Sequence, residues 1–441
     1  MSPELVTVLL LGGVMVGVLL GYPLAISIGA VGVIVGFLLF GGHIVAELYY
    51  NRVFNQLTNY ILLAVPFFVF MGTMLEKSGV AEGLYDALYL WFGGLRGGLA
   101  ITTVLIGTLM AACAGVIAAS TTMLALIGLP AMIKRGYDKS LATGVVCAGG
   151  TLGILIPPSI MLVVYGPMAN LSVGKLFFGA FIPGFLLAGL YCAYVIVYCL
   201  IRPNAGPPVS VEERQVPLGK KTVMLLKSLV PPLAIILAVL GSIFFGIAAP
   251  TEAAGVGALA SVLLALAYRK LSLRALMATA YETVKLSGMI LLIASLASAF
   301  VGVFIRAHCG AVIEEFLLAA PGGMWGAFAV VMFLCFILGM FIDWIGIVFI
   351  MVPIITPIAV AAGFDPLWFG MMICVNLQMS FLTPPFAYAI FFVKAAAAPE
   401  LGIETQHIIK GVVPFITMIV IGLALCIAFP QIITWLPGLM I

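Results

Sequence analysis

Two proline pairs lie inside long apolar segments of this chain, 227 positions apart. The first is Pro157-Pro158 and the second is Pro384-Pro385. Proline has no backbone N–H, and its ring prevents an ordinary helix from continuing through it. In a lipid bilayer, the backbone groups freed by such a break are tolerated only where protein or a water-filled cavity satisfies them. Each pair therefore predicts an interrupted helix whose freed backbone groups face protein or a cavity, and two such breaks at matching positions indicate a duplicated binding element.

The composition indicates an all-α polytopic membrane protein. Of the 441 residues, 64% are hydrophobic and only 8% are charged, which exceeds what the core of a soluble protein requires. The net charge of +3 is spread over loops, so no nucleic-acid surface is expected. The eight cysteines form no CxxC pair and the three histidines are scattered, so no transition-metal site is expected.

The apolar segments divide into two halves joined by a polar linker that contains several prolines. Each half is expected to hold a re-entrant helical hairpin followed by a broken helix, although a plain pair of membrane crossings would also fit the first hairpin. The first half is expected at 1–201, with its hairpin at about 98–133 and its broken helix at about 140–171. The linker is expected at 202–221. The second half is expected at 222–441, with its hairpin at about 323–362 and its broken helix at about 366–397.

An ungapped offset of 227 residues aligns the two halves. Over residues 130–158 it pairs seven identical residues in 29 positions. Gly136 pairs with Gly363 and Asp138 with Asp365, and a shared apolar composition explains such matches least. The halves are therefore predicted to be an internal repeat.

Basic residues predict the orientation of the chain in the membrane. They cluster at Lys134–Lys139, Arg202–Lys227 and Arg269–Arg274, and such clusters favour the cytoplasmic side. The first hairpin would then enter from the cytoplasm, and the second, near Asp365, from the outside. Five crossings in each half make the halves inverted and place both termini in the periplasm.

A hairpin tip that faces a broken helix gathers unpaired carbonyls, amides and hydroxyls at the middle of the membrane. Carbonyl and hydroxyl oxygens suit Na⁺, and helix N-termini suit an anionic solute. For each hydroxyl alone, a hydrogen bond to its own helix is the alternative. The candidate ligands of a first Na⁺ site are Ser120, Thr121, Thr122, Gly150, Thr151, Gly153 and Pro157. Those of a second Na⁺ site are Gly339, Asp343, Gly346, Asn376, Gln378, Thr383 and Pro384. The candidate ligands of the solute are Ser120, Ser159, Ser380 and Thr383.

Asp343 is the most informative single residue of this set. A carboxylate at the centre of a membrane helix costs about 2.5–3.5 kcal/mol on insertion scales, so it requires a partner or a role. Coordination of an ion is the functional interpretation. An interface position or a hydrogen bond to a nearby amide is the structural alternative.

Six stretches resemble the large membrane subunit (large permease) of tripartite ATP-independent periplasmic (TRAP) transporters, in the ion transporter superfamily. They span nearly the whole chain, and together they are specific. The stretches are Leu129-Pro130-Ala131-Met132, Arg135-Gly136-Tyr137-Asp138, Gly150-Thr151-Leu152-Gly153 with Ile156-Pro157-Pro158-Ser159, Pro250-Thr251-Glu252-Ala253-Ala254, Phe341-Ile342-Asp343-Trp344-Ile345-Gly346, and Ser380-Phe381-Leu382-Thr383-Pro384-Pro385-Phe386.

The resemblance implies a mechanism and partners that the residues alone do not. Members of this family couple inward Na⁺ flow to the uptake of organic anions, mostly carboxylates and some sulfonates. A periplasmic binding protein delivers the solute, and a small four-helix membrane subunit, here expected as a separate chain, supports the large one. The family fold has a scaffold and a mobile transport domain that works as an elevator in the bacterial inner membrane. The amphipathic segment 78–96 would then be an arm between the two domains.

We therefore expect a secondary transporter rather than an enzyme, with Na⁺ as coupling ion and no other cofactor. The chain has no GxxxxGK[ST] motif for ATP hydrolysis and no Ser-His-Asp or HExxH pattern. A related two-hairpin anion symporter that works alone is the nearest alternative. A channel and an intramembrane enzyme are the remote ones.

Overall fold

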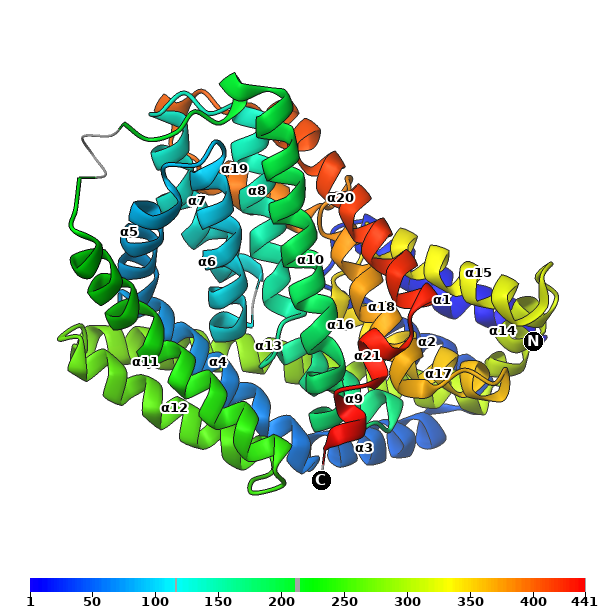
Figure 1. Cartoon of the computed structure of the whole chain (residues 1–441). Coiled ribbons are helices and arrows are strands. Elements are labelled where there is room, and N and C mark those ends of the chain that lie inside the picture. The colour runs from blue at the N-terminus through cyan, green and yellow to red at the C-terminus, as the bar shows by residue number, and fades with distance from the viewer. Residues whose placement is uncertain (116, 211–214, 441) are drawn as a thin grey trace.

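The computed structural model describes residues 1–115, 117–210 and 215–440, and over these residues the chain is helical, without strands (Figure 1). Six of its helices are long and apolar enough to cross a membrane, or up to eight if each sharply bent pair counts as one span. The prediction of an all-α protein is confirmed. Such a set of apolar helices is typical of a multi-pass membrane protein.

The first helices form the part of the molecule that precedes the predicted hairpin. The polar stretch 43–58 is itself a helix, α3, which begins after Gly41 at φ +80° and packs on α2 and α13. The elements are α1 (Pro3–Leu19), α2 (Leu24–Phe40), α3 (Gly42–Leu57), the 3-10 turn η1 (Tyr60–Leu63), α4 (Ala64–Lys77) and the amphipathic α5 (Val80–Phe92).

The segment predicted as the first hairpin folds into two helices that pack against each other, α6 (Gly98–Ala114) and α7 (Ile117–Ile133). Between them Gly115 adopts φ +61°, a left-handed conformation that glycine tolerates without a steric cost. The predicted broken helix follows as α8 (Lys139–Thr151), the 3-10 turn η2 (Leu152–Ile154) and α9 (Ile160–Ala169), and then α10 (Val173–Ile201).

The second half begins with α11 (Leu218–Phe244), α12 (Pro250–Ala267) and α13 (Leu273–Arg306). The sequence predicts an amphipathic piece near 272–286 and a separate span at 288–305, whereas the structure has one continuous 34-residue helix there. α14 (Cys309–Leu318) meets α15 (Gly323–Gly339) at a bend of 118°. The remaining elements are α16 (Trp344–Ile350), α17 (Val352–Ala361), α18 (Pro366–Ser380), α19 (Tyr388–Ala396), α20 (Thr405–Ala428) and α21 (Gln431–Thr434), with short 3-10 turns at Pro203–Ala205, Pro399–Leu401 and Pro437–Leu439.

A further proline pair, Pro231-Pro232, lies within α11 without interrupting it. The missing N–H of Pro231 leaves the carbonyl of Lys227 without its helical donor. The Tyr268 hydroxyl donates to that carbonyl at 2.7 Å. The Tyr268 hydroxyl thus supplies, at this carbonyl, the donor that Pro231 lacks.

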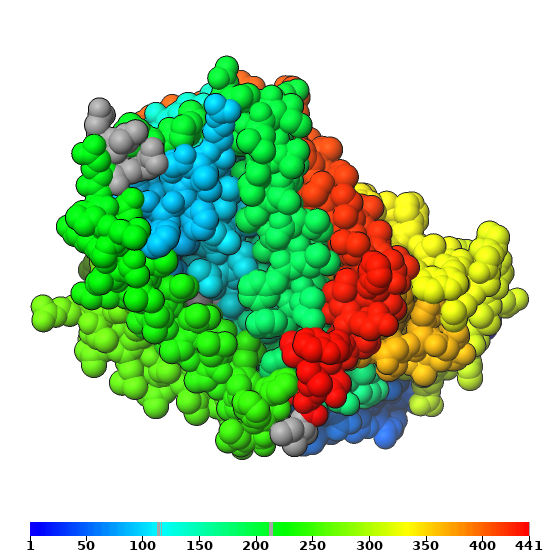
Figure 2. Space-filling model, in the orientation of Figure 1, coloured from blue at the N-terminus to red at the C-terminus, as the bar shows by residue number. Residues whose placement is uncertain are grey.

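The broken helix α8 lies between α7 and α20 and also packs on α6. A Cβ on Gly144 would lie 3.0 Å from the Gly411 Cα of α20, and one on Gly107 of α6 would lie 2.9 Å from the Gly149 Cα. Such small residues let helix backbones approach closely in a membrane protein. α20 in turn packs on α10, and Figure 2 shows the C-terminal segment (red) beside α10 (green) on one face of the molecule.

The division into two inverted halves, and into a scaffold and a mobile domain, stays a prediction. In Figure 1, helices α4, α11 and α12 form a layer below α6 and α10. The direct contacts of α4 with α6, and of α11 with α5 and α6, join this layer to the first predicted hairpin. The first hairpin is thus packed on helices that come from both halves of the sequence.

Candidate functional site

The break between α8 and α9 is enclosed by protein. Pro157 and Pro158 are both buried, and the peptide bond between them is cis. The buried Ser159 hydroxyl donates to the carbonyl of Ile154, which closes the gap across the break. Ser159, a candidate solute ligand, therefore has a structural partner on its own segment.

The break between α18 and α19 differs from the first one in exposure. Pro384, Pro385 and Phe386 are all exposed, and the Pro384-Pro385 bond is also cis. The Phe386 N–H donates to the Met340 carbonyl at 3.0 Å, directly after the end of α15. The second break is therefore bonded to the end of the neighbouring helix, while its proline pair stays accessible.

In the first half, two candidate hydroxyl side chains lie directly against the broken helix. A Cβ on Gly153 would lie 2.9 Å from the Ser120 Oγ, and one on Gly150 would lie 2.8 Å from the Thr121 Cα. Both side chains are buried, and the Thr121 hydroxyl has no hydrogen-bond partner in the part of the chain that the structure describes. Because the turn is at Gly115, these residues lie near the start of α7, not in the turn itself, where we expected them.

In the second half, polar side chains of α18 bind the backbone of α15. The Asn376 Nδ2 donates to the Met332 carbonyl at 2.8 Å, and one helical turn later the Ser380 hydroxyl donates to the Phe336 carbonyl at 3.2 Å. Gln378, which lies between them in the sequence, is fully buried, and neither its amide nitrogen nor its amide oxygen has a hydrogen-bond partner among the described residues. Of these three side chains, Gln378 is the one whose polar atoms are buried and unpaired within the described part of the chain, whereas Asn376 and Ser380 each donate one hydrogen bond to α15.

Other candidate residues are engaged elsewhere in the structure. The Thr151 hydroxyl donates to the Ala148 carbonyl at 3.0 Å and the Thr383 hydroxyl to the Met379 carbonyl at 2.8 Å, each within its own helix. A Cβ on Gly346 would lie 2.5 Å from the Leu24 side chain, so Gly346 faces α2 and not α18. Thr122 is half-buried on α7, and Gly339 packs directly against Ser380.

Asp343 lies where the two halves of the chain meet. Its Oδ1 accepts a hydrogen bond of 2.9 Å from the Trp344 N–H, so the carboxylate caps α16. The half-buried side chain also lines a mainly apolar cavity of about 230 Å³. The other residues of its wall come from the first hairpin (Gly115, Ile117, Ala118), from α9 (Ile160), from α13 (Leu286, Met289, Ile290) and from α16 and α19 (Trp344, Ile345, Tyr388, Phe392).

Sequence reasoning identified Asp343 but missed most of this wall. Gly115 carried a signal, since a glycine between two apolar helices at a short turn is typical of a left-handed residue. No sequence signal marks Leu286, Met289 and Ile290 as cavity residues, because the apolar residues of a spanning helix do not reveal which neighbouring helix they face. Among the described residues no group of three or more His, Cys, Asp or Glu side chains could hold a metal ion.

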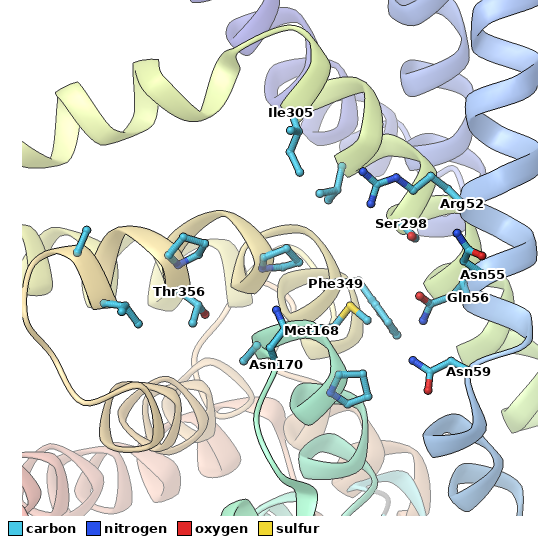
Figure 3. A pocket seen from close by; sticks show the side chains of 17 residues that line it. Arg52, Asn55, Gln56, Asn59, Met168, Asn170, Ser298, Ile305, Phe349 and Thr356 are labelled. Carbon is cyan, nitrogen blue, oxygen red and sulfur yellow. The ribbon is translucent and has the colours of Figure 1, made fainter.

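A second and larger cavity, of about 840 Å³, was not expected from the sequence. Four polar side chains, from α3 and the segment after it, point into it in Figure 3: Arg52, Asn55, Gln56 and Asn59. Ser298 of α13 lies beside Arg52 on this side, and the opposite wall comes from α9, α16 and α17 and includes Asn170, Phe349 and Thr356. The one signal for this cavity is the density of amide side chains in the polar stretch 43–58 and just beyond it.

Helices interrupted inside the protein and faced by polar side chains from other helices are typical of secondary transporters. The chain belongs to the tripartite ATP-independent periplasmic transporter family, DctM component, whose family model matches residues 11–432. It is accordingly a large permease of a bacterial TRAP transporter, a multi-pass membrane protein and not an enzyme.

Several named relatives are similar over most of this chain. The C4-dicarboxylate TRAP transporter large permease protein DctM of Vibrio cholerae is 32% identical, covering 100% of this chain and 98% of that protein. The ectoine TRAP transporter large permease protein TeaC of Halomonas elongata is 29% identical, covering 96% and 97%. The sialic acid TRAP transporter permease protein SiaT of Haemophilus influenzae is 29% identical over 89% of this chain and 62% of its own length.

The fold also resembles a solved structure outside these relatives. The crystal structure of the Alcanivorax borkumensis YdaH transporter aligns with a TM-score of 0.59, covering 87% of this chain and 89% of that one. The sequences are 14% identical, so this likeness concerns the fold.

Proposed function

We propose that this large permease takes up a small organic anion, a carboxylate or a sulfonate, by coupling it to inward Na⁺ flow. The observation that carries the proposal is the carboxylate of Asp343 in the cavity between the first hairpin and α16. An ionised carboxylate in an apolar cavity repels an anionic solute and attracts a cation. Na⁺ bound first at Asp343 would remove that repulsion, so that the solute binds only when the ion is present.

Two mirrored Na⁺ sites are proposed, one in each half. The first would use Ser120, Thr121 and Thr122 with backbone groups of the α8–α9 break at Gly150, Thr151, Gly153 and Pro157. The second would use Asp343 and Gln378 with Asn376, Thr383, Pro384 and the backbone near Gly339 and Gly346. The buried Thr121 hydroxyl and Gln378 amide support these sites, because buried polar groups without a partner are rare unless a ligand satisfies them.

The solute is proposed to lie between the two ion sites, near Ser120, Ser159, Ser380 and Thr383. A periplasmic binding protein would deliver it, and a separate small four-helix subunit would support the permease in the inner membrane. The transport domain would move as an elevator, and both termini would face the periplasm. The basic clusters at Lys134–Lys139 and Arg269–Arg274 support that orientation.

Uptake by proteoliposomes that contain both membrane subunits, with the binding protein added, tests this proposal. Asp343→Ala and Ser120→Ala should each lower Na⁺-dependent uptake by about tenfold or more, as expected when about 1.4 kcal/mol of ion binding is lost. Unchanged Na⁺ dependence in both variants would remove the site assignment. Uptake without any binding protein would favour a symporter that works alone.

A further inference from the structure

The 840 Å³ cavity between α3 and α17 is separate from the cavity at Asp343. The two share none of their lining residues. Its walls come from α3 and the C-terminal part of α13 on one side, and from the end of α9 and from α17 on the other (Figure 3). In the predicted orientation, all of these segments lie toward the periplasm. The cavity is therefore placed where a solute would enter.

A buried amide without a partner points into this cavity. Gln56 is 6% exposed, and its Nε2 makes no hydrogen bond to any described residue. Leaving a buried donor without a partner costs about 1–3 kcal/mol, so such groups are rare without a functional reason. In Figure 3, Gln56 lies on the same wall as Asn55 and Asn59 and faces Asn170 across the cavity. A ligand that accepts hydrogen bonds here would satisfy Gln56.

Arg52 supplies the charge of the cavity. It is the sole charged side chain among the described residues that line it. Its exposed guanidinium has no carboxylate partner in an ion pair over the described part of the chain. The neighbouring cation, Arg306, is engaged differently, because its guanidinium stacks over the Phe40 ring at 5.4 Å from the centroid. The cavity thus presents one free positive charge beside several neutral polar groups.

We propose that this cavity is an entry site for the transported solute, and that it selects a polar monoanion. The guanidinium of Arg52 would bind one carboxylate or sulfonate, a geometry that arginine forms bidentately. The side chains of Asn55, Gln56, Asn59 and Asn170 would bind hydroxyl or carbonyl groups on the rest of the molecule. Amides suit such groups because each offers both a donor and an acceptor.

The single charge argues against a dicarboxylate as the preferred ligand. A second carboxylate in this cavity would lie among amides and hydroxyls with no cation to replace its hydration. Relatives of this chain are named for both kinds of solute, C4-dicarboxylates and sialic acid. The inference rests on the proposed function only for the direction in which the solute travels, and the binding site itself can be tested without transport.

Scanning fluorimetry of the detergent-solubilised complex of the large and small subunits tests the site. Sodium gluconate, a monocarboxylate with several hydroxyl groups, serves as the probe, and NaCl keeps total Na⁺ constant. Ligand that binds only the folded protein raises the unfolding temperature, so the titration gives a half-saturating concentration. Disodium succinate serves as the dianionic comparison under the same conditions.

The variants should separate charge, amide and background effects. Arg52→Ala should raise the half-saturating gluconate concentration about tenfold or more, since a charge-assisted hydrogen-bonded pair is lost. Arg52→Lys should have a smaller effect because it keeps the charge but not the bidentate geometry. Gln56→Leu should also weaken the response. Arg306→Ala, the matched control outside the cavity, should leave it unchanged.

Several outcomes would overturn the inference. They are the absence of a gluconate response in the wild-type complex, an equal response in Arg52→Ala, and a response to succinate at concentrations as low as those of gluconate. Stabilisation by short-chain phosphatidylglycerol in place of gluconate would make the cavity a lipid site instead. If uptake proves independent of Na⁺ while the Arg52-dependent gluconate response remains, the proposed function fails and this site stands.

Discussion

The carboxylates of Asp138 and Asp365 cap two helices in the same way, 227 positions apart. Asp138 Oδ1 accepts from the Leu141 N–H at 2.8 Å, and Asp365 Oδ1 accepts from the Trp368 N–H at 2.7 Å. The two donors, Leu141 and Trp368, are separated by the same 227 positions. Equivalent hydrogen bonds at a constant offset support the predicted internal repeat, because shared apolar composition does not produce them.

Removing either cap should destabilise the permease. Replacing an N-cap carboxylate by Ala leaves a helix N–H without a partner and costs about 0.5–2 kcal/mol. Asp138→Ala and Asp365→Ala should therefore lower the unfolding temperature of the purified protein by similar amounts. The matched controls Asp138→Asn and Asp365→Asn should retain most of the stability, because Asn caps as well as Asp. A large loss in only one of the Ala variants would argue against equivalent roles.

Gly150→Ala should be poorly tolerated. The added Cβ would lie 2.8 Å from the Thr121 Cα, which is backbone and cannot move without shifting α7. Overpacking of this kind costs about 1–3 kcal/mol. Gly189→Ala on α10 is the control, because a Cβ there meets nothing within 4 Å and Ala favours the helix. Melting temperatures of the two variants check this, and equal stabilities would contradict the close packing of α7 on α8.

Tyr268→Phe should destabilise α11, although Phe fills the same space. The Tyr268 hydroxyl is the donor to the Lys227 carbonyl that Pro231 leaves free. Loss of that hydrogen bond should cost about 0.5–1.5 kcal/mol. The double variant Pro231→Ala with Tyr268→Phe restores a backbone donor, so the cost of the Tyr268 change should shrink in it. Thermal unfolding of the wild type, the two single variants and the double variant gives the coupling energy between Pro231 and Tyr268. Additive effects of the two substitutions would contradict this explanation.

The features that could be predicted are those that change the residue pattern locally in the sequence. Prolines, glycines and a lone carboxylate interrupt an apolar pattern, so the helix breaks at Pro157 and Pro384 and the position of Asp343 could be found without a structure. The Pro231-Pro232 pair shows the limit of such features, because α11 continues through it, with the Lys227 carbonyl bonded to Tyr268 just beyond the end of α12. A proline in the sequence shows that a backbone N–H donor is missing, but it does not show which other group donates to the freed carbonyl.

Features that depend on which helices meet could not be predicted. An amphipathic piece near 272–286 and an apolar span at 288–305 look separate in the sequence, but α13 continues through both, since a glycine such as Gly288 inside a helix costs only about 1 kcal/mol against Ala. The cavity at Arg52 likewise joins segments that are distant in sequence. No local pattern shows that a polar helix faces the ends of α9 and α17.

Gln378 should show opposite effects on stability and on transport. Its buried amide has no hydrogen-bond partner, which costs the folded protein about 1–3 kcal/mol. Gln378→Met keeps a similar volume and removes the unsatisfied groups, so the unfolding temperature without added ligand should rise. If the amide is a Na⁺ ligand, Na⁺-dependent uptake in proteoliposomes should fall in the same variant. Asn376→Leu is the comparison, because Asn376 is already bonded to the Met332 carbonyl and its loss should lower stability. A Gln378→Met protein that is both more stable and fully active would show that the amide has no part in ion binding.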